Sequence, residues 1–394
     1  MPRKILHLDL DAFFCAVEEL RDPSLAGKPF AVGGRPGERG VVASCSYPAR
    51  LSGIHSAMPM SRAVQLCPSL IIVEARHDVY GDMSHQVMER VRNLTPLVEQ
   101  VSIDEAFLDV SDLPDSAETT ARKLQSRIHT DLNLPCSLGV ATNKLLAKIA
   151  NDVGKASSRK GSPPNAITVV PPGEEAAFLA PLPVLALWGV GAKTATHLAE
   201  LGIHTIGDLA SWPEATLVDL FGKSGHDLAS RAKGLDDNSI VTSRAAKSIS
   251  QETTFNRDIK DIATLHKTLR SLTEGVGRQL RQAHLRGNTI KLKIRWPDFT
   301  TLTRQETLEQ PVDQDQEIYQ AALKLFEKVW QPGRPVRLLG VGASGLGPPV
   351  RQLTFWDSDH EKDRRLQSAL DMLRERYGNR AILRGSEMKF PPST

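Results

Sequence analysis

Two acidic stretches, each beside an apolar run, are the residues of this chain best suited to chemistry. The first holds Asp9 and Asp11 within KILHLDLDAFF, and the second holds Asp104 and Glu105 within VEQVSIDEAFLDV. Two unit charges about 4 Å apart repel by about 4 kcal/mol at an effective dielectric constant of about 20, so gathered carboxylates need a cation between them. Oxygen ligands favour Mg²⁺ or Mn²⁺. Either stretch alone is typical of solvated strand ends, but together they indicate a divalent metal site.

The local pattern predicts the elements that position these acids. Leucines alternate with polar residues over residues 5–10, which predicts a half-buried strand whose polar face carries Asp9 and Asp11. A helix is expected over residues 12–20, with Asp11 as its N-cap. The second acidic pair requires a turn or bulge, because neighbouring residues of a regular strand point to opposite faces.

The wider order of elements predicts an α+β fold. Helical periodicity in residues 83–94 and 121–132 precedes a predicted strand at 136–141 and a helix at 144–153. The order strand, helix, two strands around the acidic turn, helix, strand is that of a ferredoxin-like sheet, with the acidic cluster on its open face. Turn signals in residues 21–76 indicate a small inserted subdomain.

The second half of the chain is predicted to hold a helical region and another α+β module. Residues 174–233 are compact and helical in pattern, and residues 236–247 lack apolar periodicity and are interpreted as a linker. Residues 290–296 alternate apolar and basic side chains, which predicts a strand with one basic face. Helices are expected at 261–282 and 315–330.

Composition narrows the class of protein. A chain of 394 residues with 40% hydrophobic and 24% charged residues is expected to form two to four globular domains. No apolar run approaches the length of about eighteen residues that spans a membrane. The four cysteines lack the spacing of zinc ligands, which favours a reducing compartment, and the cytoplasm is expected.

The net charge of +3 is unevenly distributed. Residues 1–110 carry 11 Lys/Arg against 14 Asp/Glu, whereas residues 241–345 carry 17 against 11. An acidic metal-binding half joined to a basic module indicates an enzyme that acts on a polyanion, although a basic surface kept for solubility would give the same balance.

Several motifs, in order along residues 3–350, resemble those of the Y-family (translesion) DNA polymerases of the bacterial DNA polymerase IV type. They are HLDLDAFFCAVEEL, SYPARLSGIHSAMP, VSIDEAFLDVSD, GVATNKLLAKIAND and WGVGAKTATHLAELGI. The resemblance implies a right-hand polymerase with a ferredoxin-like palm, small fingers, a helical helix-hairpin-helix thumb and an α+β little finger. The implied boundaries are 1–10 and 77–165 for the palm, 11–76 for the fingers, 166–235 for the thumb, 236–247 for the linker, 248–345 for the little finger and 346–394 for a tail.

The resemblance also implies the roles of the acids. Asp9 and Asp104 would bridge two Mg²⁺ ions, for which Mn²⁺ can substitute. Glu105 would hold the ion beside the attacking primer hydroxyl, and the backbone carbonyl of Leu10 would complete the nucleotide-side ion. Asp11 matches a family acid that is not a usual ligand.

A second set of residues is expected to bind the incoming nucleotide. Tyr47 and Arg50 lie three residues apart, so both can reach a triphosphate from one helical turn. Phe14 matches the position that the family uses as a steric gate against ribose. Its neighbour Phe13 is assigned to the same set, with a core position as the alternative. Lys155 matches the family's third phosphate contact, but the loop after it is longer than usual, so Lys160 could take that role.

The remaining assignments concern DNA and a protein partner. The Gly-Val-Gly turn resembles a helix-hairpin-helix element, whose amides bind DNA phosphate, although a plain turn between packed helices is the alternative. With the basic residues of the second module, the expected DNA contacts are Gly189, Gly191, Lys247, Lys291, Lys293 and Arg295. A peptide at 352–356 resembles the motif with which bacterial polymerases bind the sliding clamp, through Gln352, Leu353, Phe355 and Trp356.

The resemblance therefore implies a template-directed, low-fidelity translesion DNA polymerase. It would add deoxynucleoside triphosphates to a primer 3′ end without proofreading, as a monomer that does not enter a membrane. A two-metal nuclease or nucleotidyl cyclase could use the same carboxylates on a related sheet. A DNA-bridging protein without catalytic activity is a third possibility.

Overall fold

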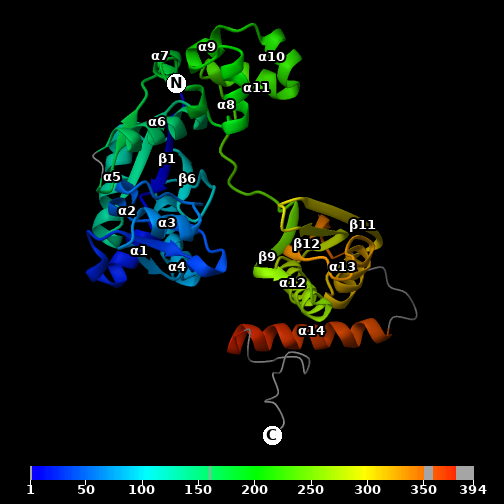
Figure 1. Ribbon diagram of the computed structural model, residues 1–394. Coiled ribbons are helices and arrows are strands. Elements are labelled where there is room, and N and C mark those ends of the chain that lie inside the picture. Colours follow the sequence, from blue (N-terminus) through cyan, green and yellow to red (C-terminus); the bar gives the residue numbers. More distant parts are fainter. Residues whose placement is uncertain (1, 159–160, 350–357, 379–394) are drawn as a thin grey trace. The chain divides into compact units, whose positions relative to one another are not determined.

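The computed structural model describes residues 2–158, 161–349 and 358–378 (Figure 1). The chain divides between Arg244 and Ala245 into two compact units. This division lies within the segment 236–247 that the sequence analysis interprets as a linker.

The first unit is built on a five-stranded sheet with the order β5-β6-β1-β7-β8. Its strands are β1 (Ile5–Leu10), β5 (Val98–Gln100), β6 (Glu105–Asp109), β7 (Cys136–Ala141) and β8 (Ile167–Val169). β1 pairs antiparallel with both β6 and β7, β5 pairs antiparallel with β6, and β8 joins β7 in parallel. The order of the first four strands is that of a ferredoxin-like sheet, which confirms the predicted fold class.

The two faces of β1 have different partners. Leu6, Leu8 and Leu10 enter a core with α4 (His77–Arg92) and α5 (Ala117–Leu132). The polar face was expected to be open, but α6 (Lys144–Ser157) packs against β1 and β7 on that side, so the expectation was wrong. Gly139 of β7 permits the close approach, because a Cβ there would lie 1.8 Å from the Ala147 carbonyl oxygen of the helix.

The turn after β1 differs from the prediction. Helix α1 (Phe13–Arg21) begins after Ala12, which has a φ of 47° and makes no side-chain cap. Asp11 is not the N-cap. Its buried carboxylate instead accepts hydrogen bonds from the Ser137 hydroxyl at 3.0 and 2.9 Å and from the Asn165 amide at 3.0 Å. These donors offset the loss of hydration of the buried carboxylate.

The segment inserted after α1 has a small core of its own. Strands β2 (Phe30–Gly33), β3 (Val42–Cys45) and β4 (Ile71–Val73) form a sheet of order β3-β2-β4. It packs with α2 (Tyr47–Leu51) and α3 (Met60–Leu66) around buried residues that include Ala31, Val42 and Met60. Short 3₁₀ turns at Pro23–Leu25 and Pro36–Glu38 carry the connections.

A helical region completes the first unit and shares a core with α6. Its helices are α7 (Glu175–Leu179), α8 (Ala192–Glu200), α9 (Ile206–Ser211), α10 (Glu214–Phe221) and α11 (Lys223–Ala232). The resemblance to a helix-hairpin-helix implies a helix before the Gly-Val-Gly turn, but the structure has only the 3₁₀ turn Val184–Ala186 there. Residues 236–244 lie along this unit. The Lys144 ammonium donates to the Ser239 carbonyl, and Glu99 accepts a hydrogen bond from the Val241 amide.

The second unit is an antiparallel sheet with helices on one side. Its order is β11-β10-β12-β9, from β9 (Ser248–Ile259), β10 (Arg286–Arg295), β11 (Thr301–Val312) and β12 (Val336–Gly347). Helices α12 (Ile262–Gln282) and α13 (Asp315–Val329) share its core and confirm the two expected helices. Helix α14 (Ser358–Tyr377) attaches through Asp371, which pairs with Arg281 of α12 at 2.6 Å.

Candidate active site

The register of two strands brings the acidic stretches together. Asp9 of β1 is the direct partner of Glu105 of β6, so both side chains lie on one face of the sheet. The Leu10 amide donates to the Asp104 carbonyl at 2.9 Å, just before β6 begins. The amides of Val101 and Ser102 both donate to the Glu105 carbonyl, which closes a turn around Asp104. The predicted turn therefore places the acids of both stretches at one end of the sheet.

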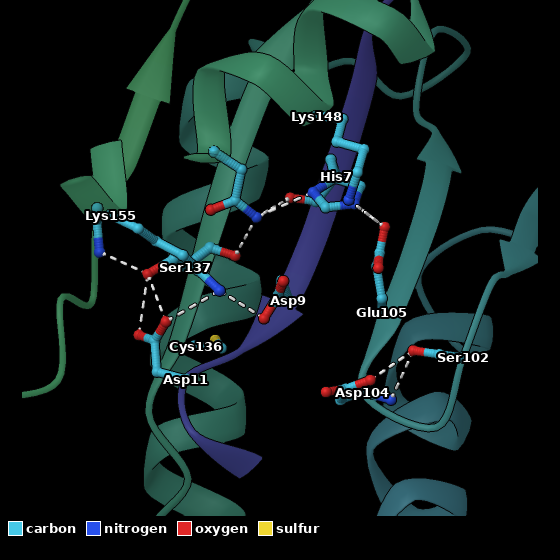
Figure 2. Close-up of polar contacts among 12 residues, drawn as sticks. His7, Asp9, Asp11, Ser102, Asp104, Glu105, Cys136, Ser137, Lys148 and Lys155 are labelled. Carbon is cyan, nitrogen blue, oxygen red and sulfur yellow. Dashed lines mark hydrogen bonds and ion pairs between the residues drawn. The ribbon is translucent and has the colours of Figure 1, made fainter. Parts of the chain in front are cut away.

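Each carboxylate has its own partner within the protein (Figure 2). The Lys155 ammonium lies 2.5 Å from Asp9, and the Ser102 hydroxyl lies 2.5 Å from Asp104. Glu105 contacts both His7 and Lys148 at 2.7 Å. Among the described residues, no three acidic, His or Cys side chains converge closely enough to hold one metal ion.

The donor set nevertheless fits a divalent cation. The set consists of the backbone carbonyl of Leu10 and the carboxylates of Asp9, Asp104 and Glu105. These are hard oxygen ligands of the kind that Mg²⁺ and Mn²⁺ prefer. Two of the carboxylates already attract ammonium groups, so this end of the sheet stabilises positive charge. Binding of an ion by all three would require their side chains to turn away from Lys155, Lys148 and Ser102.

His7 fixes the direction of Glu105. The imidazole is fully buried, and its Nδ1 accepts a hydrogen bond of 2.9 Å from the Asn151 side-chain amide. Nε2–H is therefore the group that donates to Glu105. Burial lowers the pKa of His7, although Glu105 opposes the effect, so the ring is neutral near pH 7. His7 was not predicted to belong to the site, although strand alternation places it on the same face as Asp9.

Two lysines of α6 and their surroundings set the charge of the acids. Burial tends to raise the pKa of Glu105, but hydrogen bonds from His7 and Lys148 outweigh it and bring the pKa to about 2. Burial raises the pKa of Asp9, and Lys155 opposes this shift. Lys155 is itself partly desolvated, but Asp9 and Asp11 outweigh that effect and raise its pKa. Its ammonium therefore remains charged.

Three polar residues of α6 share this face of the sheet because of their spacing. Lys148, Asn151 and Lys155 are three and four residues apart, so they line one side of the helix. Of these three residues, only Lys155 was predicted from the sequence to belong to the site. The spacing was visible in the sequence, but which side of α6 faces β1 follows only from the packing.

A pocket of about 320 Å³ opens beside the acids. Its lining contains two of the acids, Asp9 and Asp104, together with Leu10. It also contains the expected nucleotide-binding residues Phe13, Phe14, Tyr47, Arg50 and Lys155. The Arg50 guanidinium lies 4.9 Å from the centroid of the Tyr47 ring, and its Nε donates to the Cys45 carbonyl. Burial raises the pKa of the Tyr47 phenol, which therefore stays protonated. Lys160 lies outside the described residues.

The Gly-Val-Gly turn is shaped by an arginine. Gly189 has a φ of 99°, which favours glycine, and a Cβ there would lie 2.7 Å from a guanidinium nitrogen of Arg231. Arg231 donates to the Trp188 carbonyl at 3.1 Å, which holds the turn from the side of α11. Gly191 is the N-cap of α8.

The basic residues of the second unit lie on the sheet face opposite its helices. Lys291 and Lys293 border a shallow pocket of about 230 Å³ over the glycines of β12. Lys293 forms an ion pair with Glu252 at 2.6 Å, and Arg295 donates to the Thr301 hydroxyl. Lys247 is exposed just before β9. The peptide 352–356 lies outside the described residues.

Known structures and families define the class of this fold and site. The fold is similar to that of a Y-family DNA polymerase chimera of Dbh and Dpo4, with a TM-score of 0.77, 26% identity and coverage of 88% of this chain and 99% of that chain. The insertion ternary complex of Dbh DNA polymerase gives a TM-score of 0.61 and 26% identity, with coverage of 86% of this chain and 98% of that chain. Residues 8–152 match the impB/mucB/samB family, and residues 246–355 match its C-terminal domain. The chain belongs to this family of Y-family DNA polymerases.

Curated relatives specify the type of enzyme within that class. The chain is 40% identical to DNA polymerase IV of Dehalococcoides mccartyi, with 98% of both chains covered. It is 45% identical to DNA polymerase IV of Streptomyces coelicolor, over 89% of this chain and 72% of that protein. It is 39% identical to DNA polymerase IV of Listeria monocytogenes, over 88% of this chain and 96% of that protein. The chain is thus a DNA-directed DNA polymerase most like bacterial DNA polymerase IV.

Proposed function

We propose that Asp9, Asp104 and Glu105 form the catalytic centre of this translesion polymerase, at the mouth of the pocket that contains Phe14. The observation that carries this proposal is the pairing of Asp9 with Glu105 across β1 and β6, with Asp104 in the turn beside them. The enzyme acts on DNA and nucleotides and depends on divalent metal ions. We identify these ions as two Mg²⁺, for which Mn²⁺ can substitute.

We base the roles of the acids on their positions and on the resemblance to the family. Asp9, Asp104, Glu105 and the Leu10 carbonyl would hold the ions. When bound, the ions supply positive charge that lowers the pKa of the primer 3′-hydroxyl and neutralises the leaving pyrophosphate. His7 directs Glu105 through its hydrogen bond, and in the metal-free protein Lys148 helps to keep Glu105 ionised. Lys155, Tyr47 and Arg50 supply the charge and the hydrogen-bond donors for the triphosphate, since all three line the pocket.

Primer extension tests this assignment. Asp104→Ala and Glu105→Ala should abolish nucleotide addition on a primed template with Mg²⁺, while binding to the same DNA stays within a few-fold of wild type. Asp82→Ala, which removes an exposed carboxylate of α4, is the matched control and should extend normally. Normal extension by both active-site variants would contradict the assignment, and degradation of the primer in place of extension would indicate a nuclease.

Phe14 is proposed as the steric gate, with Phe13 beside it. A flat ring that borders the sugar site leaves room for hydrogen at C2′ but not for hydroxyl, so selectivity comes from a clash. Phe14→Ala should raise ribonucleotide incorporation far more than it lowers deoxynucleotide incorporation. Phe13 is 2% exposed and is part of the core, so Phe13→Leu should change stability more than sugar selectivity.

Two sequence-independent contacts are proposed for the DNA. The amides of Gly189 and Gly191 would bind a backbone phosphate at the beginning of α8. Lys291, Lys293 and Arg295 would bind phosphates across the basic sheet face, and Lys247, just before β9, would add a further contact. These contacts go to the backbone, as an enzyme that accepts any template requires.

A sliding clamp is the proposed protein partner. Residues 352–356 read Gln-Leu-Thr-Phe-Trp, and two bulky aromatic residues in an extended peptide can anchor in an apolar pocket. Alanine at Gln352, Leu353, Phe355 and Trp356 should abolish clamp-stimulated synthesis and spare unstimulated extension. Equal binding of the clamp by this variant would place the docking site elsewhere.

We also propose that the enzyme works as a monomer in the cytoplasm, which sedimentation and cell fractionation would test. No described helix is long and apolar enough to cross a membrane.

A further inference from the structure

The ring of Phe14 is supported from behind by a second aromatic ring. Phe14 borders the nucleotide pocket and also stacks on Tyr80 of α4, with ring centroids 4.2 Å apart and an interplanar angle of 14°. His77 meets the Phe14 ring edge-on at 6.0 Å. The face of Phe14 that stacks on Tyr80 therefore cannot move back without displacing another ring.

Tyr80 is itself held by the buried carboxylate of Glu18, which also pairs with Arg76. Its hydroxyl donates to one oxygen of Glu18 at 2.7 Å, and the Arg76 guanidinium donates to the other oxygen at 2.7 Å. Tyr80 is 0% exposed and Glu18 is 1% exposed, so water does not compete for the bond between them, whereas the Arg76 side chain is 46% exposed. Burial, together with the hydrogen bond to Glu18, raises the pKa of Tyr80 to about 12, which keeps the hydroxyl available as a donor.

The connection joins two helices that are far apart in the sequence. Phe14 and Glu18 are four residues apart on α1, so their side chains lie next to each other on that helix. Tyr80 comes from α4 and contacts both of them, by stacking on the first and by hydrogen bonding to the second. The position of the Phe14 ring is thus fixed by α4 as well as by its own helix.

A steric gate works only if its side chain does not yield. Sugar discrimination by clash requires the added hydroxyl to meet an atom that cannot retreat, and close-packed rings provide this resistance. We propose that Tyr80, anchored by Glu18 and Arg76, is a positioning residue that sets the sugar selectivity of the enzyme by fixing Phe14. This inference rests on the proposed role of Phe14 as the gate.

The test compares nucleotide affinities without the chemical step. The dissociation constants of a deoxynucleoside triphosphate and of its ribonucleotide counterpart are measured on a complex with a dideoxy-terminated primer and template. Loss of one stacked aromatic pair corresponds to a change of about threefold to tenfold in an equilibrium constant. Tyr80→Leu should lower the preference for deoxyribose by this factor. Tyr80→Phe keeps the ring but loses the bond to Glu18, so it should lower the preference by less.

Two controls separate the possible outcomes. Met88→Ala, a buried change two turns further along α4, should lower stability but leave the sugar preference at the wild-type value. Phe14→Ala should remove most of the preference. If Phe14→Ala removes the preference for deoxyribose while both Tyr80 variants retain it, Phe14 is the steric gate and the role of Tyr80 is refuted. If Phe14→Ala also retains the preference for deoxyribose, the proposal that Phe14 is the steric gate is refuted.

Discussion

Lys155 holds together the partly buried Asp9 and the buried Asp11, and its removal should make the stability of the protein depend on Mg²⁺. The ammonium lies 2.5 Å from Asp9 and 3.3 Å from Asp11. The Asp11 side chain has no exposure, and the side chains of Asp9 and Lys155 are 23% and 22% exposed. Lys155→Met keeps the length of the side chain and removes its charge, which leaves two neighbouring carboxylates without a counter-charge.

The size of the effect follows from the burial. Removal of one partner from a buried ion pair costs about 3–5 kcal/mol. Because Asp9 and Lys155 keep some contact with water, we expect the lower end, about 3 kcal/mol, in the absence of divalent ions. An ion that binds the same carboxylates stabilises the fold by about 2.7 kcal/mol when its free concentration is 100 times its dissociation constant. The variant should gain more from the ion than wild type does, since no ammonium competes with the ion.

Urea denaturation in EDTA measures the cost of the substitution, and urea denaturation in Mg²⁺ measures the stabilisation by the ion. The difference in free energy of unfolding between wild type and Lys155→Met should be about 3 kcal/mol in EDTA and should shrink when Mg²⁺ is added. Lys123→Met is the matched control, because Lys123 pairs with Asp115 at 2.6 Å at the surface. That change should cost less than about 1 kcal/mol and should not respond to Mg²⁺. A Lys155→Met variant as stable as wild type in EDTA, or a difference that Mg²⁺ leaves unchanged, would refute the reasoning.

Three further predictions test the site and its supports. The pKa of Glu105 is about 2 in the folded protein, below its ordinary 4.5, so its ionised form contributes stability above pH of about 4.5 that is lost as the pH falls towards 2. The difference in free energy of unfolding between wild type and Glu105→Gln should therefore close over this range in urea titrations at a series of pH values, and a constant difference would contradict it. Gly139→Ala should destabilise the protein strongly, because its Cβ would meet the Ala147 carbonyl oxygen at 1.8 Å. Gly81→Ala, in α4 with no atom within 4 Å of the new Cβ, should stabilise it by about 0.5–1 kcal/mol, and thermal melts of both variants decide this. Lys291→Ala should reduce the salt dependence of DNA binding by about one unit of slope, equally for every DNA sequence. Lys293→Ala should reduce it less, since Glu252 already neutralises part of that charge.

The sequence alone determined several of the elements and their apolar faces. Alternation in residues 5–10 predicted β1 with its observed bounds, and the helices over 261–282 and 315–330 were found within a residue of α12 and α13. These predictions succeed because the period of the apolar residues records which side of an element is buried. The motifs likewise indicated the family before any contact was known.

Tertiary structure decided which side chains act on one another. The pairing of Asp9 with Glu105 depends on the register between β1 and β6, and a shift of one residue would turn one of the two to the opposite face. The burial of Asp11 beside Ser137 and the support of Phe14 by Tyr80 each join segments more than sixty residues apart. Local periodicity shows that a side chain is buried but does not identify its partner, because the partner is set by packing between distant segments. For this reason Asp11 was mistaken for a cap, and the acidic face, which α6 covers, was mistaken for an open one.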